Sequence, residues 1–328
     1  VIRCLASLGA NFDIASIFEL QKLQTLGIPA ERMSYGNTIK KASDIAFAYE
    51  QGLRLFASDC ESDIRKLAKF APGSKVYIRV LTEGSETADW PLSRKFGCQR
   101  DMAVELILLA RELGLEPYGI SFHVGSQQRD ISSWDAAIGK VRFIFDQLAD
   151  AGIQLQMMNM GGGMPAHYKQ RQQDIDAYGS AIRRFLEEDF GDTPPRVIIE
   201  PGRSLVAEAG VLVSEVVQIS TKSQDSLDRW VYLDVGLFGG LIEAIGEAIQ
   251  YPLRWDREGG EDEEVIIAGP TCDSMDILYE DHRYRLPLNL QEGDRLYWLS
   301  TGAYTTSYSS VEFNGIPPLR SYMLDTEE

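Results

Sequence analysis

The sequence predicts an α/β fold: a closed, TIM-like (β/α)8 barrel followed by a C-terminal β-domain. Up to about residue 205, short apolar or β-branched runs alternate with amphipathic helical stretches. Glycines and polar residues follow these runs directly, and helical periodicity nearly disappears after residue 210. Such alternation indicates a parallel sheet wrapped by helices, whereas the later part is typical of antiparallel strands. We therefore expect a barrel domain over residues 1–209 and a β-domain over residues 210–328.

Seven apolar runs in the first part have the length and composition of strands. They are Asn11–Ala15, Arg32–Tyr35, Leu53–Ala57, Lys75–Val80, Tyr118–His123, Leu155–Asn159 and Arg196–Ile199. Between them lie stretches with apolar residues three and four positions apart, which predict helices. Examples of these helical stretches are Asp101–Leu113, Ser133–Ala149 and Asp174–Glu188.

The positions of polar residues favour a closed barrel over an open doubly wound sheet. An open sheet tolerates seven strands, whereas a barrel of this type needs eight. Polar or glycine residues follow nearly every predicted strand, among them Asp13, His123, Gly161–Gly163 and Glu200. Functional residues at the carboxyl ends of nearly all strands are typical of the barrel. We therefore expect its first strand to lie upstream of Val1.

The second part of the chain reads as a mostly antiparallel sheet. Its expected strands are Val211–Ile219, Trp230–Leu233, Glu264–Ile267 and Arg295–Leu299. One helical stretch remains, at Leu241–Ile249, and the acidic residues 258–264 are most simply a solvated loop.

Composition excludes several classes of function. The net charge of −17 over 328 residues would repel nucleic acid, although it agrees with a cationic substrate. No apolar run is long enough to span a membrane. The four cysteines are scattered without a zinc-binding or disulfide pattern, which indicates reduced thiols in a cytoplasm. They are Cys4, Cys60, Cys98 and Cys272.

Two strand-end motifs have the chemistry to bind a phosphorylated heterocycle. Gly161–Gly163 lets backbone N–H groups approach a phosphate closely, but a tight structural turn explains the same glycines. In the motif Glu200–Arg203, a carboxylate can pair with a ring nitrogen while Gly202 and Arg203 hold a phosphate. The alternative is an internal ion pair between Glu200 and Arg203.

Two further motifs place reactive side chains in loops. His123 ends a strand, where its imidazole can stack on a ring, act in acid–base chemistry or simply be hydrogen-bonded. Gly269–Asp276 places Cys272 beside two carboxylates, which could hold a substrate ammonium. A buried structural cysteine and solvated carboxylates are the alternatives.

Together and in this order, the motifs resemble the pyridoxal-phosphate-dependent ornithine/lysine decarboxylases of bacteria. The resemblance covers nearly the whole chain and implies an alanine-racemase-like barrel of fold type III. The matching stretches are Asn11–Ser16, Ser34–Lys41, residues 92–97, Ser121–Gln127, Gly161–Gly163, Glu200–Arg203, Gly269–Asp276 and Trp298–Tyr308.

The resemblance implies a role for each of these residues towards pyridoxal 5'-phosphate. Glu200 would pair with the pyridine nitrogen and keep it protonated, so that the ring draws electrons from the substrate. His123 would stack on the ring, and Asp13 would lie beside the linkage between lysine and cofactor. The phosphate would be held by Ser126, Gly161, Gly162, Gly163, Gly202, Arg203 and Tyr304.

The resemblance also implies a shared active site. Cys272 would return a proton to the substrate carbon, and Asp273 would bind the distal ammonium of the substrate. Both residues reach the cofactor of the neighbouring subunit in this family, so a homodimer is expected.

Two departures from the family pattern stand out. The lysine that links the cofactor lies on the first barrel strand in the family, in a motif that this chain lacks, so we expect that lysine upstream of Val1. Lys40 and Lys41 follow a different strand and are poor substitutes. The acidic residue that usually faces the distal amine falls on Gly246, and Glu243 or Glu247 could supply its charge.

The expected function is therefore decarboxylation of a basic amino acid. The first expectation is L-ornithine to putrescine, or L-lysine to cadaverine, in polyamine biosynthesis. A different cationic substrate on the same fold, and a non-catalytic homologue, remain as alternatives.

Overall fold

The computed structural model describes residues 1–83, 87–91, 95–257 and 259–324. Parts of two sequence features, residues 92–94 of one family motif and residue 258 of the acidic loop, lie outside this range. The described chain forms two compact units. A barrel unit comprises Val1–Gly163 and Asp174–Pro201, and a β-unit comprises Met164–Gln173 and the chain from Gly202 onward. The boundary between residues 209 and 210 remains a prediction.

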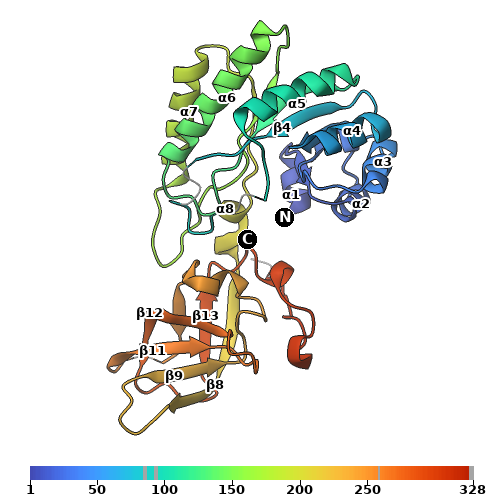
Figure 1. The fold of residues 1–328 in the computed structure, drawn as a ribbon. Coiled ribbons are helices and arrows are strands. Elements are labelled where there is room, and N and C mark those ends of the chain that lie inside the picture. The colour runs from blue at the N-terminus through green and yellow to red at the C-terminus, as the bar shows by residue number, and fades with distance from the viewer. Residues whose placement is uncertain (84–86, 92–94, 258, 325–328) are drawn as a thin grey trace. The chain divides into compact units, whose positions relative to one another are not determined.

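All seven predicted strands of the barrel unit are confirmed. They are parallel and pair in sequence order, and the sheet curls into a half-barrel (Figure 1). The strands are β1 (Phe12–Ile14), β2 (Met33–Tyr35), β3 (Leu55–Ser58), β4 (Lys75–Arg79), β5 (Glu116–Ser121), β6 (Met157–Asn159) and β7 (Arg196–Ile198).

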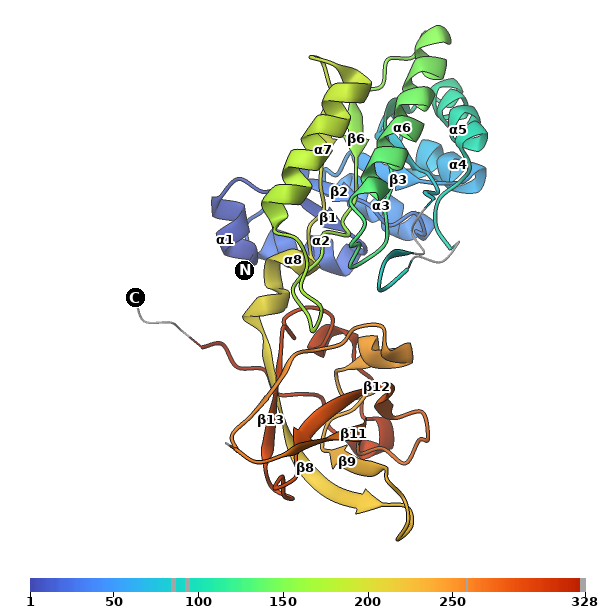
Figure 2. The ribbon, with the colours of Figure 1, turned by 90° about the vertical axis from the view of Figure 1, so that its left-hand side faces the viewer.

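Helices connect successive strands of the barrel unit (Figure 2). In α6 the residues at three- and four-residue spacing, from Trp134 to Leu148, are buried, as the sequence pattern predicts. The three predicted helices correspond to α5, α6 and α7. The helical segments are α1 (Ile2–Ser7), α2 (Ile17–Thr25), η1 (Ala30–Arg32), α3 (Ala42–Glu50), α4 (Glu61–Phe70), α5 (Arg100–Glu112), α6 (Ser132–Asp150) and α7 (Ile175–Phe190).

One face of the curled sheet carries both an apolar layer and polar strand ends. Tyr77 and Met157 belong to a buried cluster that spans β3 to β6. Because side chains two residues apart share a face, Arg79 and Asn159 at the carboxyl ends of β4 and β6 lie on the same face as this cluster. The sheet therefore gathers polar groups where its strands end.

The β-unit is built on a six-stranded sheet in the order β10-β13-β8-β9-β11-β12. Only the β9–β11 pair is parallel, which confirms the mostly antiparallel prediction. The strands are β8 (Val211–Thr221), β9 (Arg229–Leu233), β10 (Leu253–Trp255), β11 (Asp262–Ala268), β12 (Ile277–Pro287) and β13 (Arg295–Leu299). Short helical segments are α8 (Arg203–Val206), η3 (Ala207–Ala209), η4 (Ile242–Glu247), η5 (Thr306–Tyr308) and η6 (Phe313–Gly315).

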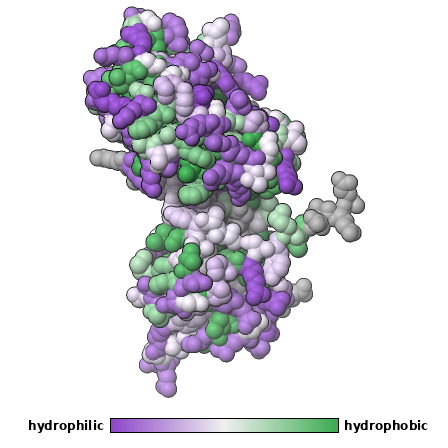
Figure 3. Space-filling view, turned by 90° about the vertical axis from the view of Figure 1, so that its right-hand side faces the viewer, coloured by the Kyte–Doolittle hydropathy of each residue, from purple (hydrophilic) through white to green (hydrophobic). Residues whose placement is uncertain are grey.

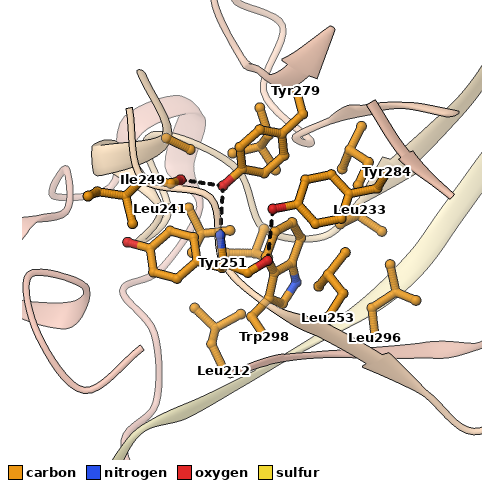
Figure 4. Packing of buried hydrophobic residues seen from close by; sticks show 14 of the residues in the cluster. Leu212, Leu233, Leu241, Ile249, Tyr251, Leu253, Tyr279, Tyr284, Leu296 and Trp298 are labelled. Carbon is orange, nitrogen blue, oxygen red and sulfur yellow. Dashed lines mark hydrogen bonds between the residues drawn. The ribbon is translucent and has the colours of Figure 1, made fainter. Parts of the chain in front are cut away.

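Aliphatic and aromatic residues together form the core of this unit (Figure 4). Tyr251, Tyr279 and Trp298 are fully buried and pack edge to face or stacked. The Tyr279 hydroxyl donates to the carbonyl of Ile249 at 2.6 Å, and the Tyr284 hydroxyl donates to the carbonyl of Tyr251 at 2.8 Å. These bonds tie the sheet to the loop before β10, because a buried hydroxyl needs a partner.

The β-unit differs from the prediction in several elements. The predicted helix over Leu241–Ile249 is a kinked 3-10 segment, because Ile245 is extended and Gly246 has a φ of 60°. Residues 262–264 of the predicted acidic loop begin strand β11, and strands β10 and β12 were not predicted. Strand β12 lies at an edge of the sheet. Its central residues, from Glu280 to Arg283, are charged or polar and at least partly exposed, as an edge strand permits.

Surface character agrees with the composition. Hydrophilic side chains dominate the face of the barrel unit in Figure 3, with apolar residues scattered among them. Within the described ranges, no helix is both long and apolar enough to cross a membrane.

Candidate active site

Asp13 occupies the middle of β1, beside Ser34 of β2 and Gly36. Its Oδ1 accepts a hydrogen bond from the Ser34 hydroxyl at 2.5 Å. A side chain on Gly36 would come within 2.0 Å of the carboxylate, so glycine is required for this approach. The structure therefore fixes Asp13 against the neighbouring strand.

Glu200 follows β7 and is held by a residue that the sequence analysis missed, Asn159. The Asn159 side-chain amide donates to Glu200 Oε1 and accepts from the Gly161 N–H at 2.9 Å. The Glu200 N–H in turn donates to the Gly161 carbonyl at 2.8 Å. Asn159 thus ties the carboxylate to the glycine loop. Asn159 ends a predicted strand, as His123 does. This strand-end position was the only sign in the sequence that Asn159 could belong to the site.

The two carboxylates of this site influence each other. Solvent reaches Asp13, but protein atoms surround its carboxylate. The resulting loss of hydration, followed by repulsion from Glu200, raises the pKa of Asp13 well above its ordinary value. Burial also raises the pKa of Glu200, against the lowering effect of Asn159 and Arg79. Arg79, a second residue missed from the sequence, is the positive charge facing both carboxylates. A cationic group entering here would relieve their repulsion.

His123 lies directly after β5 with a neutral ring. Its Nδ1 accepts a hydrogen bond from the Gly125 N–H at 3.0 Å, which leaves the ring hydrogen on Nε2. Burial, and then the positive charge of Arg79, lower the pKa of His123 to about 4. A neutral imidazole suits stacking on a charged heterocycle better than a cation does.

The three glycines approach other backbone segments too closely for any side chain. An added Cβ would lie 2.4 Å from the Phe122 carbonyl at Gly161, 2.7 Å from the Glu200 carbonyl at Gly162, and 2.5 Å from the Gly125 carbonyl at Gly163. Close backbone packing, the structural alternative to phosphate binding, therefore explains part of the need for glycine in this motif. The same packing brings the loop against His123 and Glu200, with His123 Nε2 3.5 Å from the Cβ position of Gly162. Ser126 lies in the loop that follows β5, three residues after His123.

In the β-unit, Arg203 is buried in a two-pronged ion pair with Glu243. The two guanidinium nitrogens donate to Glu243 Oε2 and Oε1 at 2.6 and 2.7 Å, and one also donates to the Tyr168 hydroxyl at 2.8 Å. Burial opposes the charge of Arg203, but the bonds to Glu243 and Tyr168 raise its pKa above the ordinary value. The alternative of an ion pair between Glu200 and Arg203 is wrong, because Arg203 pairs with Glu243.

Tyr304 completes this group. Its ring lies over the Arg203 guanidinium, 4.7 Å from ring centre to carbon. Its hydroxyl is 3.9 Å from the Cβ position of Gly202. Gly202, Arg203 and Tyr304, three of the predicted phosphate ligands, are therefore together in one unit.

The carboxylate of Glu247 is hydrogen-bonded to strand β12. It accepts hydrogen bonds from the backbone N–H groups of Glu280, Asp281 and His282, at 2.6 to 2.7 Å, and contacts His282 Nδ1 at 2.6 Å. Burial alone would raise the pKa of Glu247, but these partners lower it. Both acidic residues considered for the substrate amine, Glu243 and Glu247, thus have protein partners on each oxygen.

Cys272 is exposed on the loop between β11 and β12, and it forms no disulfide. The neighbouring Asp273 accepts the Met275 N–H at 2.9 Å, which closes a short turn. The sequence alternative of a buried structural cysteine is wrong for Cys272.

Lys40 is excluded as a cofactor-binding lysine within the barrel unit. Its ammonium is buried and donates to Asp63 Oδ2 at 2.8 Å and to the Ala57 carbonyl at 2.7 Å. Asp63 also accepts the Ser58 hydroxyl. Lys40 is therefore a structural residue, which agrees with the expectation that it is a poor substitute for the cofactor-binding lysine.

Residues 1–207 match the family model described as "Pyridoxal-dependent decarboxylase, pyridoxal binding domain". The chain belongs to the pyridoxal-dependent decarboxylase family. Pyridoxal 5'-phosphate is therefore its cofactor. The site fits this group: Glu200 is a buried carboxylate that gains from a cationic ring nitrogen, and His123 offers a neutral ring beside the glycine loop.

Named relatives extend this match over the β-unit. The chain is 33% identical to the lysine/ornithine decarboxylase of Selenomonas ruminantium over 316 residues, which cover 96% of this chain and 78% of the relative. It is 32% identical to the ornithine decarboxylase of Mus musculus over 330 residues, with 96% and 70% covered. The structure of the Vibrio vulnificus lysine/ornithine decarboxylase with cadaverine superposes with a TM-score of 0.83 at 30% identity, covering 95% and 81%.

Proposed function

We propose that this pyridoxal-phosphate-dependent decarboxylase acts on L-ornithine, giving putrescine, and also on L-lysine, giving cadaverine. The observation that carries the proposal is Glu200, a strand-end carboxylate held by Asn159 and crowded by Asp13. The names of the relatives point to these two substrates. The products place the enzyme in polyamine biosynthesis.

Each site residue has a part in holding the cofactor. The bound cofactor draws in the electron pair that remains on the substrate when carbon dioxide departs. Glu200 would accept a hydrogen bond from the ring nitrogen, because its carboxylate is oriented by Asn159. His123 would stack on the ring. Ser126, Gly161–Gly163, Gly202, Arg203 and Tyr304 would hold the phosphate.

The loop of the β-unit would act on the substrate. Cys272 would donate a proton to the carbon that has lost carbon dioxide, and its exposed side chain, which forms no disulfide, supports this role. Asp273 would accept hydrogen bonds from the distal ammonium. Three acidic residues were candidates for binding the distal ammonium. Glu243 is paired with Arg203 and Glu247 with backbone N–H groups, so we assign this role to Asp273.

Assembly and location follow from the family resemblance and the cysteines. We propose a homodimer in which Cys272 and Asp273 of one subunit serve the cofactor of the other. The four thiols carry no disulfide in the structure, which supports a reducing cytoplasm as the site of action.

One observation favours a second substrate class. The position where relatives usually carry an acidic residue is Gly246, an open position with a φ of 60° and nothing within 4 Å of its Cβ position. A missing carboxylate there leaves room for a different cationic amino acid.

Carbon dioxide release by the full-length protein tests the proposal. The protein would be given pyridoxal phosphate and, in parallel, ornithine, lysine, arginine and diaminopimelate. We expect release from ornithine and lysine. Release from arginine alone would support the second substrate class. If the cofactor is bound and none of the four amino acids releases carbon dioxide, the proposed function is contradicted.

A further inference from the structure

A buried carboxylate anchors the loop that carries Cys272. Asp276 accepts hydrogen bonds from the Leu237 N–H at 2.8 Å and from the Thr271 N–H and hydroxyl at 3.1 and 2.7 Å. A side chain on Gly269 would come within 2.3 Å of this carboxylate. The base of the loop is therefore fixed, while Cys272 near its tip remains exposed.

A single oxygen of Asn314 holds the tip. Asn314 Oδ1 accepts hydrogen bonds from the Cys272 N–H at 3.1 Å and from the Cys272 thiol at 3.6 Å. The two residues are 42 positions apart in the sequence. Because one atom binds both the backbone and the side chain of Cys272, it restrains the position of the residue and the rotamer of its thiol.

The chemistry of this contact favours one form of the thiol. A side-chain amide oxygen only accepts hydrogen bonds, so the sulfur must carry its hydrogen to make the 3.6 Å bond. A thiolate would place a negative charge against the same oxygen. The contact therefore fixes the direction of the S–H bond from which a proton would be donated.

The backbone around Asn314 fixes this contact. Glu312, Asn314 and Gly315 have φ values of 53°, 56° and 74°, in the left-handed region that asparagine and glycine tolerate best. The Phe313 ring packs 4.7 Å from that of Phe238 in the same unit. Asn314 is thus presented to Cys272 by a left-handed turn whose neighbouring Phe313 packs on Phe238.

We propose that Asn314 is a positioning residue that holds the Cys272 thiol in the orientation needed for proton donation. This rests on the proposed role of Cys272. The proton passes from sulfur to the substrate carbon that has lost carbon dioxide, and the electron pair left on that carbon forms the new C–H bond. The resulting thiolate takes a proton from water and regains its bond to Asn314.

Alkylation by iodoacetamide tests the contact on the full-length holoenzyme. The rate at each cysteine would be followed by peptide mass spectrometry at one neutral pH. Asn314→Gly keeps the left-handed backbone and removes the acceptor, so the rate at Cys272 should rise about two- to fivefold, the effect of losing one weak hydrogen bond. Asn314→Asp keeps an acceptor and adds a negative charge that opposes thiolate formation, so the rate should fall by a similar factor.

Matched controls separate this effect from a general loosening of the turn. Glu312→Gly changes a neighbouring left-handed residue whose carboxylate has no hydrogen bond within the described chain, and should leave the Cys272 rate unchanged. Cys4 and Cys60, both exposed, report any global change. The inference is overturned if both Asn314 variants accelerate alkylation alike, or if neither changes it.

Steady-state kinetics on ornithine connect the contact to the reaction. Asn314→Gly should lower kcat by about tenfold with a much smaller change in KM, because only proton return is impaired. An unchanged kcat would overturn the positioning role. A wild-type protein that binds cofactor but releases no carbon dioxide would instead refute the proposed function, and the alkylation rates would still report on the contact.

Discussion

The polar residues of the candidate site in the barrel unit are positioned, or have their charge offset, by neighbouring residues. Asn159 joins Glu200 to the glycine loop, and Arg79 offsets the charges of Glu200 and Asp13. The sequence could identify Glu200 and His123 because their residue types are distinctive. It could not identify Asn159, since an asparagine at a strand end becomes informative only when its two partners are known.

Asn159→Asp should weaken the binding of pyridoxal phosphate by about tenfold or more. The substitution removes the donor to Glu200 and places a second carboxylate against it, which costs on the order of 1–3 kcal/mol in a buried site. Cofactor affinity measured by absorbance titration checks this. Asn11→Asp, at an exposed position before β1, should bind like the wild type. Equal affinity in both variants would remove Asn159 from the site.

Asp13→Asn should stabilise the cofactor-free protein, and more so at higher pH. The raised pKa of Asp13 means that the folded protein holds this proton more tightly than the unfolded chain. The charged form therefore lowers stability above the raised pKa, and this penalty disappears as the pH falls to the ordinary carboxyl value of about 4.

Melting temperatures of wild type and Asp13→Asn across the pH range check this sign. The difference should be positive near neutral pH and shrink in acid. A difference that does not vary with pH would show that the loss of the Ser34 hydrogen bond, not charge, decides the outcome.

At the scale of elements, the regular βα alternation made the barrel unit predictable. The strands from β1 to β7 are short, and polar residues or glycine lie at or within a few residues of the end of each one. The β-unit was less predictable. β12 is an edge strand with charged residues at its centre, so its sequence lacks alternation, and η4 is broken by Gly246 despite apolar residues at helical spacing. The pairing of Arg203 with Glu243, 40 residues apart, also has no local signal.

Gly162→Ala should abolish cofactor binding by displacing the glycine loop. The new Cβ would meet the Glu200 carbonyl at 2.7 Å, and both partners are backbone that cannot move independently. Gly179→Ala on α7 is the matched control, because nothing lies within 4 Å of its Cβ position. It should bind cofactor normally and melt slightly higher, as alanine favours a helix by about 1 kcal/mol. Normal binding by Gly162→Ala would contradict the arrangement of this loop.

For the molecule as a whole, each unit contributes one part of the proposed chemistry. The barrel unit supplies Glu200 and His123, and the β-unit supplies Arg203, Tyr304 and Cys272.

The Arg203–Glu243 pair is buried in the β-unit, so Glu243→Gln should lower the free energy of unfolding by about 3–5 kcal/mol. The substitution leaves the Arg203 guanidinium as an uncompensated buried charge. Chemical denaturation measures this value. A loss below 1 kcal/mol would mean that Arg203 is neutralised by other groups.

The most direct test of the central claim compares wild type with Glu200→Ala, both full-length and loaded with pyridoxal phosphate. Carbon dioxide release from L-ornithine would be measured per bound cofactor. We predict turnover by the wild type and a loss of at least about a hundredfold in the variant, since electrostatic stabilisation by a buried group contributes on that order. Equal turnover in the two proteins, or no release by a cofactor-loaded wild type, would contradict the account.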